Sequence, residues 1–260
     1  MNNDNITPMR PSLFRAIRKG FIDAYDHLGY VVFMTFTTFV LTTLIAGLMS
    51  FVWRSIGTPN VVKILSMLPA VFIAYLCAVG VNYFAGMSAY RQHPILLDTL
   101  DGIRKLIKPA LKMFIIDTII TVVLVADFIF FFVMIGSRHT FIFAVPAILI
   151  GYATFTWLLM LVYHLPLLAS QFLLESNPSV RVILRKSFLL LADNPGFTVG
   201  LFLVIIAFAV LCVVPMFIGI AFLFLGASAF LVTHALRELF VKYGIVEQEP
   251  EVVEDNWPNK

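Results

Sequence analysis

The sequence predicts an all-α, polytopic membrane protein, a bundle of six transmembrane helices. Hydrophobic residues make up 60% of its 260 residues and charged residues only 13%, about half the charged share of an ordinary soluble domain. The mean hydropathy is +0.95. Because lipid offers no partners for open backbone groups, the spans must be helices.

The uncharged runs of the sequence locate the six spans, since about 20 apolar residues cross a hydrocarbon core. They are predicted at about 28–53, 64–90, 113–136, 141–165, 197–214 and 217–238. A turn at Pro215 and Gly219 divides the last long run into two spans. The fourth span is interpreted as one helix that continues past Pro166 into the interface. Residues 1–243 then form a single transmembrane domain, followed by an acidic tail, 244–260, that is expected to be disordered.

The distribution of Lys and Arg sets the predicted orientation. Three of the 18 basic residues, Arg54, Lys63 and Arg138, lie in the connections assigned to the outer side, and the others lie at the opposite side. Both termini are therefore expected in the cytoplasm. The basic residues are spread over four separate segments and form no single stripe, so no nucleic-acid binding is expected.

The dipeptide Arg-Lys occurs at Arg18-Lys19, Arg104-Lys105 and Arg185-Lys186, each time shortly before an odd-numbered span. This spacing predicts three parallel units, each a basic amphipathic helix followed by an out-and-back hairpin. The first basic helix has an apolar stripe that includes Phe14 and Phe21. The middle helix fits less well, because Asp98, Asp101 and Pro109 interrupt it.

Two interpretations of these basic helices remain open. They are interfacial helices on the cytoplasmic side, with cations near anionic lipid headgroups, or they form a docking collar for a partner.

Asp127 is the strongest candidate for a functional residue within the predicted spans. It lies 15 residues after Lys112, about 22 Å along its helix. A charged carboxylate at such depth costs roughly 2.5–3.5 kcal/mol, so Asp127 should face the bundle interior or be protonated. It is interpreted as either a proton or cation site or a structural acid bonded to a neighbouring span.

Four other polar residues, Asn82, Asp117, His164 and His234, are expected in the cytoplasmic half of the spans. A His/Asp pair there could bind a metal or relay protons, but no two of them share a helix at ligand spacing, so no metal site or cofactor is predicted. Asn82 is expected to form an interhelical hydrogen bond. Small residues, Gly219, Gly226 and Ala229 on the sixth span and Ala85 with Ala89 on the second, predict close-packing faces.

The segment "HLPLLASQFLLESNPSVRVILRKSFLLLADNPGFTVGLFLV", residues 164–204, resembles the YesL-like family of bacterial integral membrane proteins. Leu165-Pro166, Arg185-Lys186 and Asn194-Pro195 carry the likeness, and the layout of residues 84–112 is also similar. YciC-like six-span proteins are similar to nearly the same degree. The resemblance implies a bacterial inner-membrane protein, with some relatives encoded beside carbohydrate ABC transporters, and it transfers no catalytic residue.

The sequence contains no Walker loop and no HExxH, GxSxG or CxxC motif, and no enzymatic activity is expected. The favoured hypothesis is a non-catalytic accessory or scaffold protein of the bacterial inner membrane, and a link to transport is part of this hypothesis. Its expected partners are anionic lipids and either another membrane protein or further copies of the chain. The alternative is a small-solute or ion permease that uses Asp127.

Overall fold

The computed structural model describes residues 11–56, 62–63, 66–90, 93–138, 143–175, 178–214 and 217–247. Within these residues every regular element is a helix, which confirms the predicted all-α class. In chain order the elements are α1 (Leu13–Asp26), α2 (Leu28–Ile56), α4 (Leu68–Ala89), α5 (Leu96–Arg138), α6 (Ala144–Glu175), α7 (Val180–Asp193), α8 (Pro195–Val213), the π-helix η2 (Ile220–Phe224) and α9 (Leu225–Lys242).

Six helical segments of the described chain are long and apolar enough to cross a membrane. They are Leu28–Trp53, Leu68–Ala89, Leu96–Ile135, Ala144–Glu175, Pro195–Val213 and Ile220–Lys242. The prediction of six spans is therefore confirmed, and the chain is a multi-pass membrane protein. The fourth span does continue through Pro166 as one helix. Of the predicted tail, residues 248–260 lie outside the described part.

The middle basic segment corrects the sequence prediction. Arg104 and Lys105 belong to α5 itself, which runs without a break from Leu96 to Arg138 and contains Pro109 in its interior. The helix stays continuous because Leu106, Ala110 and Met113, on one face around the proline, are fully buried. Asp98 caps the helix instead of interrupting it, since its carboxylate accepts the Ile95 N–H at 2.7 Å. With 43 residues, α5 is about 65 Å long and extends well beyond a hydrocarbon core.

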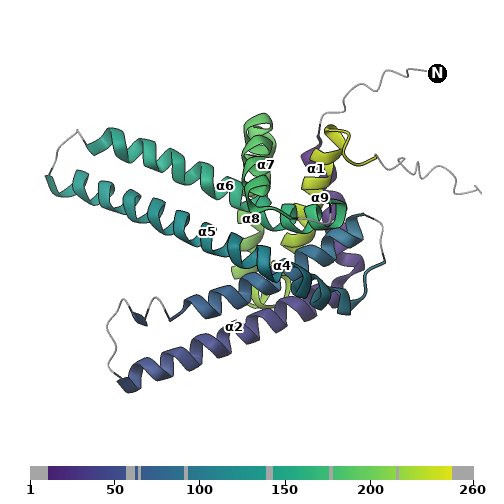
Figure 1. The fold of residues 1–260 in the computed structure, drawn as a ribbon, viewed down its shortest axis with the longest axis horizontal. Coiled ribbons are helices and arrows are strands. Elements are labelled where there is room, and N and C mark those ends of the chain that lie inside the picture. The colour runs from purple at the N-terminus through teal and green to yellow at the C-terminus, as the bar shows by residue number, and fades with distance from the viewer. Residues whose placement is uncertain are drawn as a thin grey trace, which may run out of the picture.

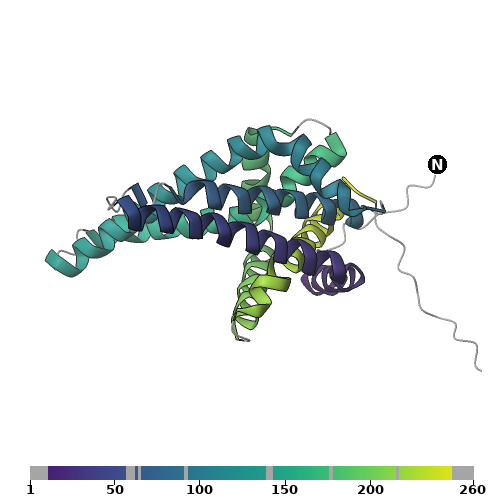
Figure 2. The same cartoon turned by 90° about the horizontal axis from the view of Figure 1, so that it is seen from below.

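The spans form three hairpins that diverge from a shared region. In Figure 1 the α2–α4 hairpin and the α5–α6 hairpin extend to the same side, away from the place where α1 and α9 lie. Figure 2 shows that the hairpin of α8 with η2 and α9 runs across the direction of these two. The turn of this last hairpin falls between Val213 and Ile220, as predicted, and Phe217 adopts a φ of 65° there.

The core lies where α9 and α4, the spans with the largest buried share, pack against α1, α2 and α6. Close contact depends on small residues. A Cβ on Gly20 of α1 would meet the Leu231 Cα atom of α9 at 2.9 Å, and one on Gly226 would meet the Val31 Cα atom of α2 at 3.0 Å. Ala85, Ala89 and Ala229 are buried, as their predicted close-packing faces require.

The π-helix has a local consequence at the same contact. A π turn widens the helix and leaves a backbone group after it without its usual partner. The N–H of Gly226, just after η2, donates instead to Thr35 Oγ1 on α2 at 3.0 Å. The irregular turn thus connects α9 to α2.

Candidate functional site

Two separate Asp–His clusters join the helices. The first, the Asp117 cluster, consists of Tyr75 on α4, Asp117 on α5, His164 on α6 and Ser187 on α7. His164 Nδ1 lies 3.0 Å from Asp117 Oδ1, and its Nε2 lies 3.2 Å from Ser187 Oγ. Tyr75 donates its hydroxyl to Asp117 Oδ2 at 3.2 Å. The cluster therefore connects four helices through the Asp117 carboxylate and the buried imidazole of His164.

The hydrogen bonds of the Asp117 cluster allow two proton arrangements. Ser187 also lies 2.9 Å from the Leu184 carbonyl oxygen. When its hydroxyl donates to that carbonyl, both ring nitrogens of His164 donate, and the imidazolium forms an ion pair with the Asp117 carboxylate. When the hydroxyl donates to Nε2 instead, the ring is neutral and Nδ1–H donates to Asp117. In both arrangements Asp117 keeps its hydrogen bond from His164.

The order Asp117–His164–Ser187 has the geometry of a hydrolytic triad, but access argues for a structural role. A nucleophile must reach its substrate, and Ser187 is 0% exposed while His164 is 1% exposed. Two cavities border α7, and Ser187 lines neither of them. The arrangement is suited to holding helices together.

The second, the Asp23 cluster, consists of Asp23 on α1, His27 after it, Ser88 on α4 and His234 on α9. The Asp23 carboxylate accepts from Ser88 Oγ at 2.8 Å and lies 2.9 Å from His234 Nε2 and 3.1 Å from His27 Nδ1. Burial raises the pKa of Asp23, but the hydrogen bonds from His234 and Ser88 and the charges of the two histidines together lower it below its ordinary 3.8. The cluster fastens α1 to α4 and α9.

The four predicted polar residues of the spans are not brought together as one cluster. Asp117 and His164 meet, whereas His234 pairs with Asp23 of α1. The Asn82 amide donates to the Ala78 carbonyl of its own helix at 2.8 Å, in place of the expected interhelical bond. Among the described residues no group of three or more His, Cys, Asp or Glu is placed to hold a metal ion.

Asp127 lies on the exposed side of α5, so the first alternative, that it faces the bundle interior, is wrong, and the second, that it is protonated, stays a prediction. From Thr121 onward α5 contacts α6 through another face, where Trp157 donates to Thr121 at 3.0 Å and Phe128 lies against Gly151. The most apolar stretch of α5 contains no buried residue. Asp127 therefore interrupts an otherwise apolar, uncovered surface.

The predicted basic residues occupy varied surroundings. Arg18, Arg104, Lys105 and Arg185 are exposed. Arg104 pairs loosely with Asp101 at 3.9 Å, and Lys186 pairs closely with Glu175 at 2.7 Å.

A buried arginine was not predicted as a site residue. Arg237 is 8% exposed near the end of α9, and its charge acts on Tyr90 at the end of α4. Burial raises the pKa of Tyr90 above its ordinary 10.0, although a hydrogen bond with Ser170 and the charge of Arg237 oppose that rise. On the neighbouring residue of α9, Glu238 lies 3.9 Å from Arg15 of α1. A polar layer thus closes this end of the bundle.

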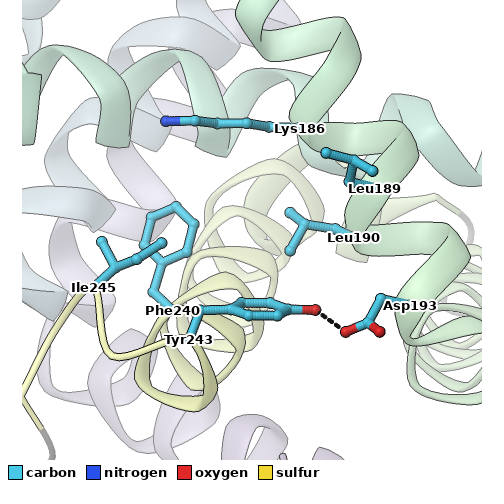
Figure 3. Close-up of a pocket in the computed structure, with 7 residues that line it drawn as sticks. All are labelled: Lys186, Leu189, Leu190, Asp193, Phe240, Tyr243 and Ile245. Carbon is cyan, nitrogen blue, oxygen red and sulfur yellow. Dashed lines mark hydrogen bonds between the residues drawn. The ribbon is translucent and has the colours of Figure 1, made fainter.

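An apolar groove lies between α7 and the end of α9, and we call it the α7–α9 groove. Its volume is about 410 Å³, and its lining is Lys186, Leu189, Leu190, Asp193, Phe240, Tyr243 and Ile245. Figure 3 shows the apolar side chains between Lys186 on one side and the Asp193–Tyr243 pair on the other. Hydrogen bonds from Lys242 and Tyr243 lower the pKa of Asp193. At this rim of the groove the Asp193 carboxylate is therefore paired with Lys242.

Sequence reasoning missed Tyr75, Ser187 and the α7–α9 groove, because each depends on which helices become neighbours. One signal was available for Asp23. It precedes His27 by four residues and lies on the same helix face as Ala16 and Gly20, and small residues of this kind mark a closely packed face.

Comparisons with models of known protein families, with curated proteins and with solved structures gave no match. The resemblance to YesL-like proteins therefore stays a prediction.

Proposed function

We propose that this chain is a non-catalytic accessory or scaffold protein of a bacterial inner membrane that binds a partner within the bilayer. The observation that carries the proposal is Asp127, a carboxyl group exposed on the uncovered outer half of α5. A membrane partner that presents a hydrogen-bond donor to Asp127 would cover this surface and satisfy the carboxyl group at the same time.

The surroundings of Asp127 explain why a partner is needed. Its neighbours one turn away on the exposed side, Val123 and Phe130, are apolar, and Asp127 forms no hydrogen bond or ion pair with another described residue. The nearest cations along the helix, Lys112 and Arg138, are 15 and 11 residues away, about 22 and 16 Å. In lipid such an acid costs roughly 2.5–3.5 kcal/mol, and contact with a partner lowers that cost.

The basic helices support a second part of the proposal, attachment to the cytoplasmic side of the membrane. On α1, Phe14, Phe21 and Tyr25 are exposed on one side and Arg18 on the adjoining side, while the small residues face α9. On α7, Phe188 is exposed beside Arg181 and Arg185. Exposed aromatic residues next to cations are typical of helices that lie in an anionic interface. Together with the basic start of α5, they support the expectation of three parallel units with both termini in the cytoplasm.

The alternative, a small-solute or ion permease that uses Asp127, requires a path to that carboxyl group through the protein. The exposed position of Asp127 supports a partner-binding role instead.

The test compares Asp127→Leu with Asp127→Asn after extraction of native membranes into polymer nanodiscs. Asn keeps a donor and an acceptor at similar volume, so a stoichiometric partner should remain with wild type and Asp127→Asn. With Asp127→Leu the partner should bind about three- to twenty-fold more weakly, the range of measured interhelical hydrogen bonds. Ile129→Ala, on the opposite exposed side of α5, is the control and should leave binding unchanged.

A different result would favour the permease. A protein that purifies without any partner, moves a solute in proteoliposomes and loses that flux as well-folded Asp127→Asn would contradict the accessory role.

A further inference from the structure

The end of α9 directs the chain into the α7–α9 groove. Gly244 has a φ of +67°, the Ile245 N–H donates to the Phe240 carbonyl at 2.9 Å, and the Gly244 N–H donates to the Val241 carbonyl at 3.0 Å. This is a Schellman motif, which ends the helix and reverses the chain. Ile245 then lines the groove, and Val246 packs against the main core. The described chain thus ends, at Glu247, beside the wall of the groove.

The groove offers apolar surface that the described chain leaves open. Leu189 is 52% exposed and Ile245 is 54% exposed, although both line it. The polar groups at its two ends already have partners, since Lys186 pairs with Glu175 and Asp193 pairs with Lys242. An occupant therefore has to be largely apolar where it contacts the floor of the groove.

Two cations of α7 precede the groove residue Leu189 along the helix. Arg185 precedes Leu189 by one helical turn, and Arg181 precedes Arg185 by another. Both are exposed, and neither forms an ion pair with another described residue. An occupant with negative charge next to its apolar side chains would complement these cations.

The remaining 13 residues of the chain, 248–260, have that composition. The segment "QEPEVVEDNWPNK" contains the acids Glu249, Glu251, Glu254 and Asp255 and the apolar residues Val252, Val253 and Trp257. Thirteen residues reach at most about 45 Å, and a segment tethered by so short a linker is present at an effective concentration in the millimolar range. It starts at the groove wall, so even a weak contact is populated.

We propose that residues 248–260 bind in the α7–α9 groove as an intramolecular cap. Val252, Val253 and Trp257 cover the apolar lining, and the acids lie beside Arg181 and Arg185. The cap then competes with anionic headgroups for the same cations of α7, so that its binding and release change how strongly α7 attaches to the membrane. This inference is independent of the partner at Asp127.

The test uses the full chain, labelled with 5-fluorotryptophan, in nanodiscs of zwitterionic lipid. The fluorine resonance of Trp257 is identified by its loss in Trp257→Phe. Its broadening by a water-soluble gadolinium chelate measures how accessible the indole is. We expect Trp257 to be protected in wild type and to lose that protection in Leu189→Ser. Phe188→Ser is the matched control, because Phe188 is adjacent, equally exposed at 53%, and does not line the groove.

A second variant tests the charge complementarity. Arg181→Glu with Arg185→Glu should remove the protection of Trp257, whereas Lys105→Glu on α5 should not. Broadening of Trp257 in wild type equal to that of free 5-fluorotryptophan would overturn the proposal. Protection that survives unchanged in Leu189→Ser would also overturn it, because the indole would then be covered by lipid or by another surface.

Discussion

His164 on α6 and Asp117 on α5 form a buried pair, with 3.0 Å between Nδ1 and Oδ1. Because His164 also contacts Ser187 on α7, this pair fixes the relative position of three helices. A buried, fully hydrogen-bonded network of this kind strongly disfavours a shifted packing, since any slip leaves polar groups unsatisfied.

Removing one member of this pair should destabilise the protein more than removing both. His164→Leu leaves Asp117 buried with Tyr75 as its remaining described partner, and we expect a loss of about 3–5 kcal/mol, as for a broken buried pair. The double variant His164→Leu with Asp117→Leu removes both charges and should be closer to wild type. Unfolding in mixed micelles measures both. Additive losses would show that the two residues act independently.

The Asp23 cluster predicts a loss of stability in acid. The folded pKa of Asp23 lies below its ordinary 3.8, so the carboxylate stabilises the fold above that pH, and the stabilisation disappears as the pH falls through the folded pKa. Thermal unfolding of wild type and Asp23→Asn between pH 6 and pH 3 should show a difference that shrinks with acid. The exposed Asp26 on the same helix provides the control Asp26→Asn, whose difference from wild type should be small throughout.

The contact of α1 with α9 predicts opposite effects of the same substitution at two glycines. Gly20→Ala must push Leu231 backbone away, because the new Cβ would lie 2.9 Å from its Cα atom, and we expect a cost of about 1–3 kcal/mol. Gly47→Ala on α2 meets nothing within 4 Å and should gain up to about 1 kcal/mol from helix propensity. Equal effects at both positions, measured by unfolding, would contradict the close packing of α1.

The predicted topology can be tested with reporter fusions. Fusions after residues 58, 137 and 217 should report the outer side, and fusions after residues 100, 186 and 250 should report the cytoplasm, because cations are retained there. One clean inversion would require a different arrangement of the six spans.

The basic helices predict a dependence of attachment on lipid charge. Replacing Arg18, Lys19, Arg185 and Lys186 with Glu should raise α1 and α7 out of an anionic membrane, since each cation near the surface contributes about 1 kcal/mol. The depth of spin labels along residues 11–27 measures this for α1, with a zwitterionic bilayer as the control. If the spin labels of the variant lie at the same depth in the anionic bilayer as those of wild type, apolar contacts alone attach the helix.

The helices could be predicted from the sequence because hydrophobic length and turn residues are local properties. These properties predicted the six spans, the helix through Pro166 and the turn before Ile220. The continuity of α5 did not, because Pro109 and Asp98 suggest a break until the burial of Leu106 and Met113 is known. The pairing of His164 with Asp117 was within reach, as both were placed at the same depth.

The partners of Asp23 and the exposure of Asp127 were out of reach for a different reason. Each depends on the rotation of a helix about its axis and on the neighbour that it meets. Asp127 lies on a helix so apolar on all sides that its hydrophobic pattern does not distinguish a buried face from an exposed one.

The packing of α1 against α9 determines the order in which parts of this protein can fold during its synthesis. Gly20 and Ala24 meet a helix that begins only at Leu225, so the first helix leaves the ribosome roughly two hundred residues before its main partner exists. Until then the Asp23 carboxylate has no His234, and the small-residue face of α1 has no cover. Long-range contacts of this kind form late in folding. Burial of the small-residue face of α1 therefore reports that the whole chain has been made. A chain that stops before α9 keeps this face exposed to chaperones and membrane proteases.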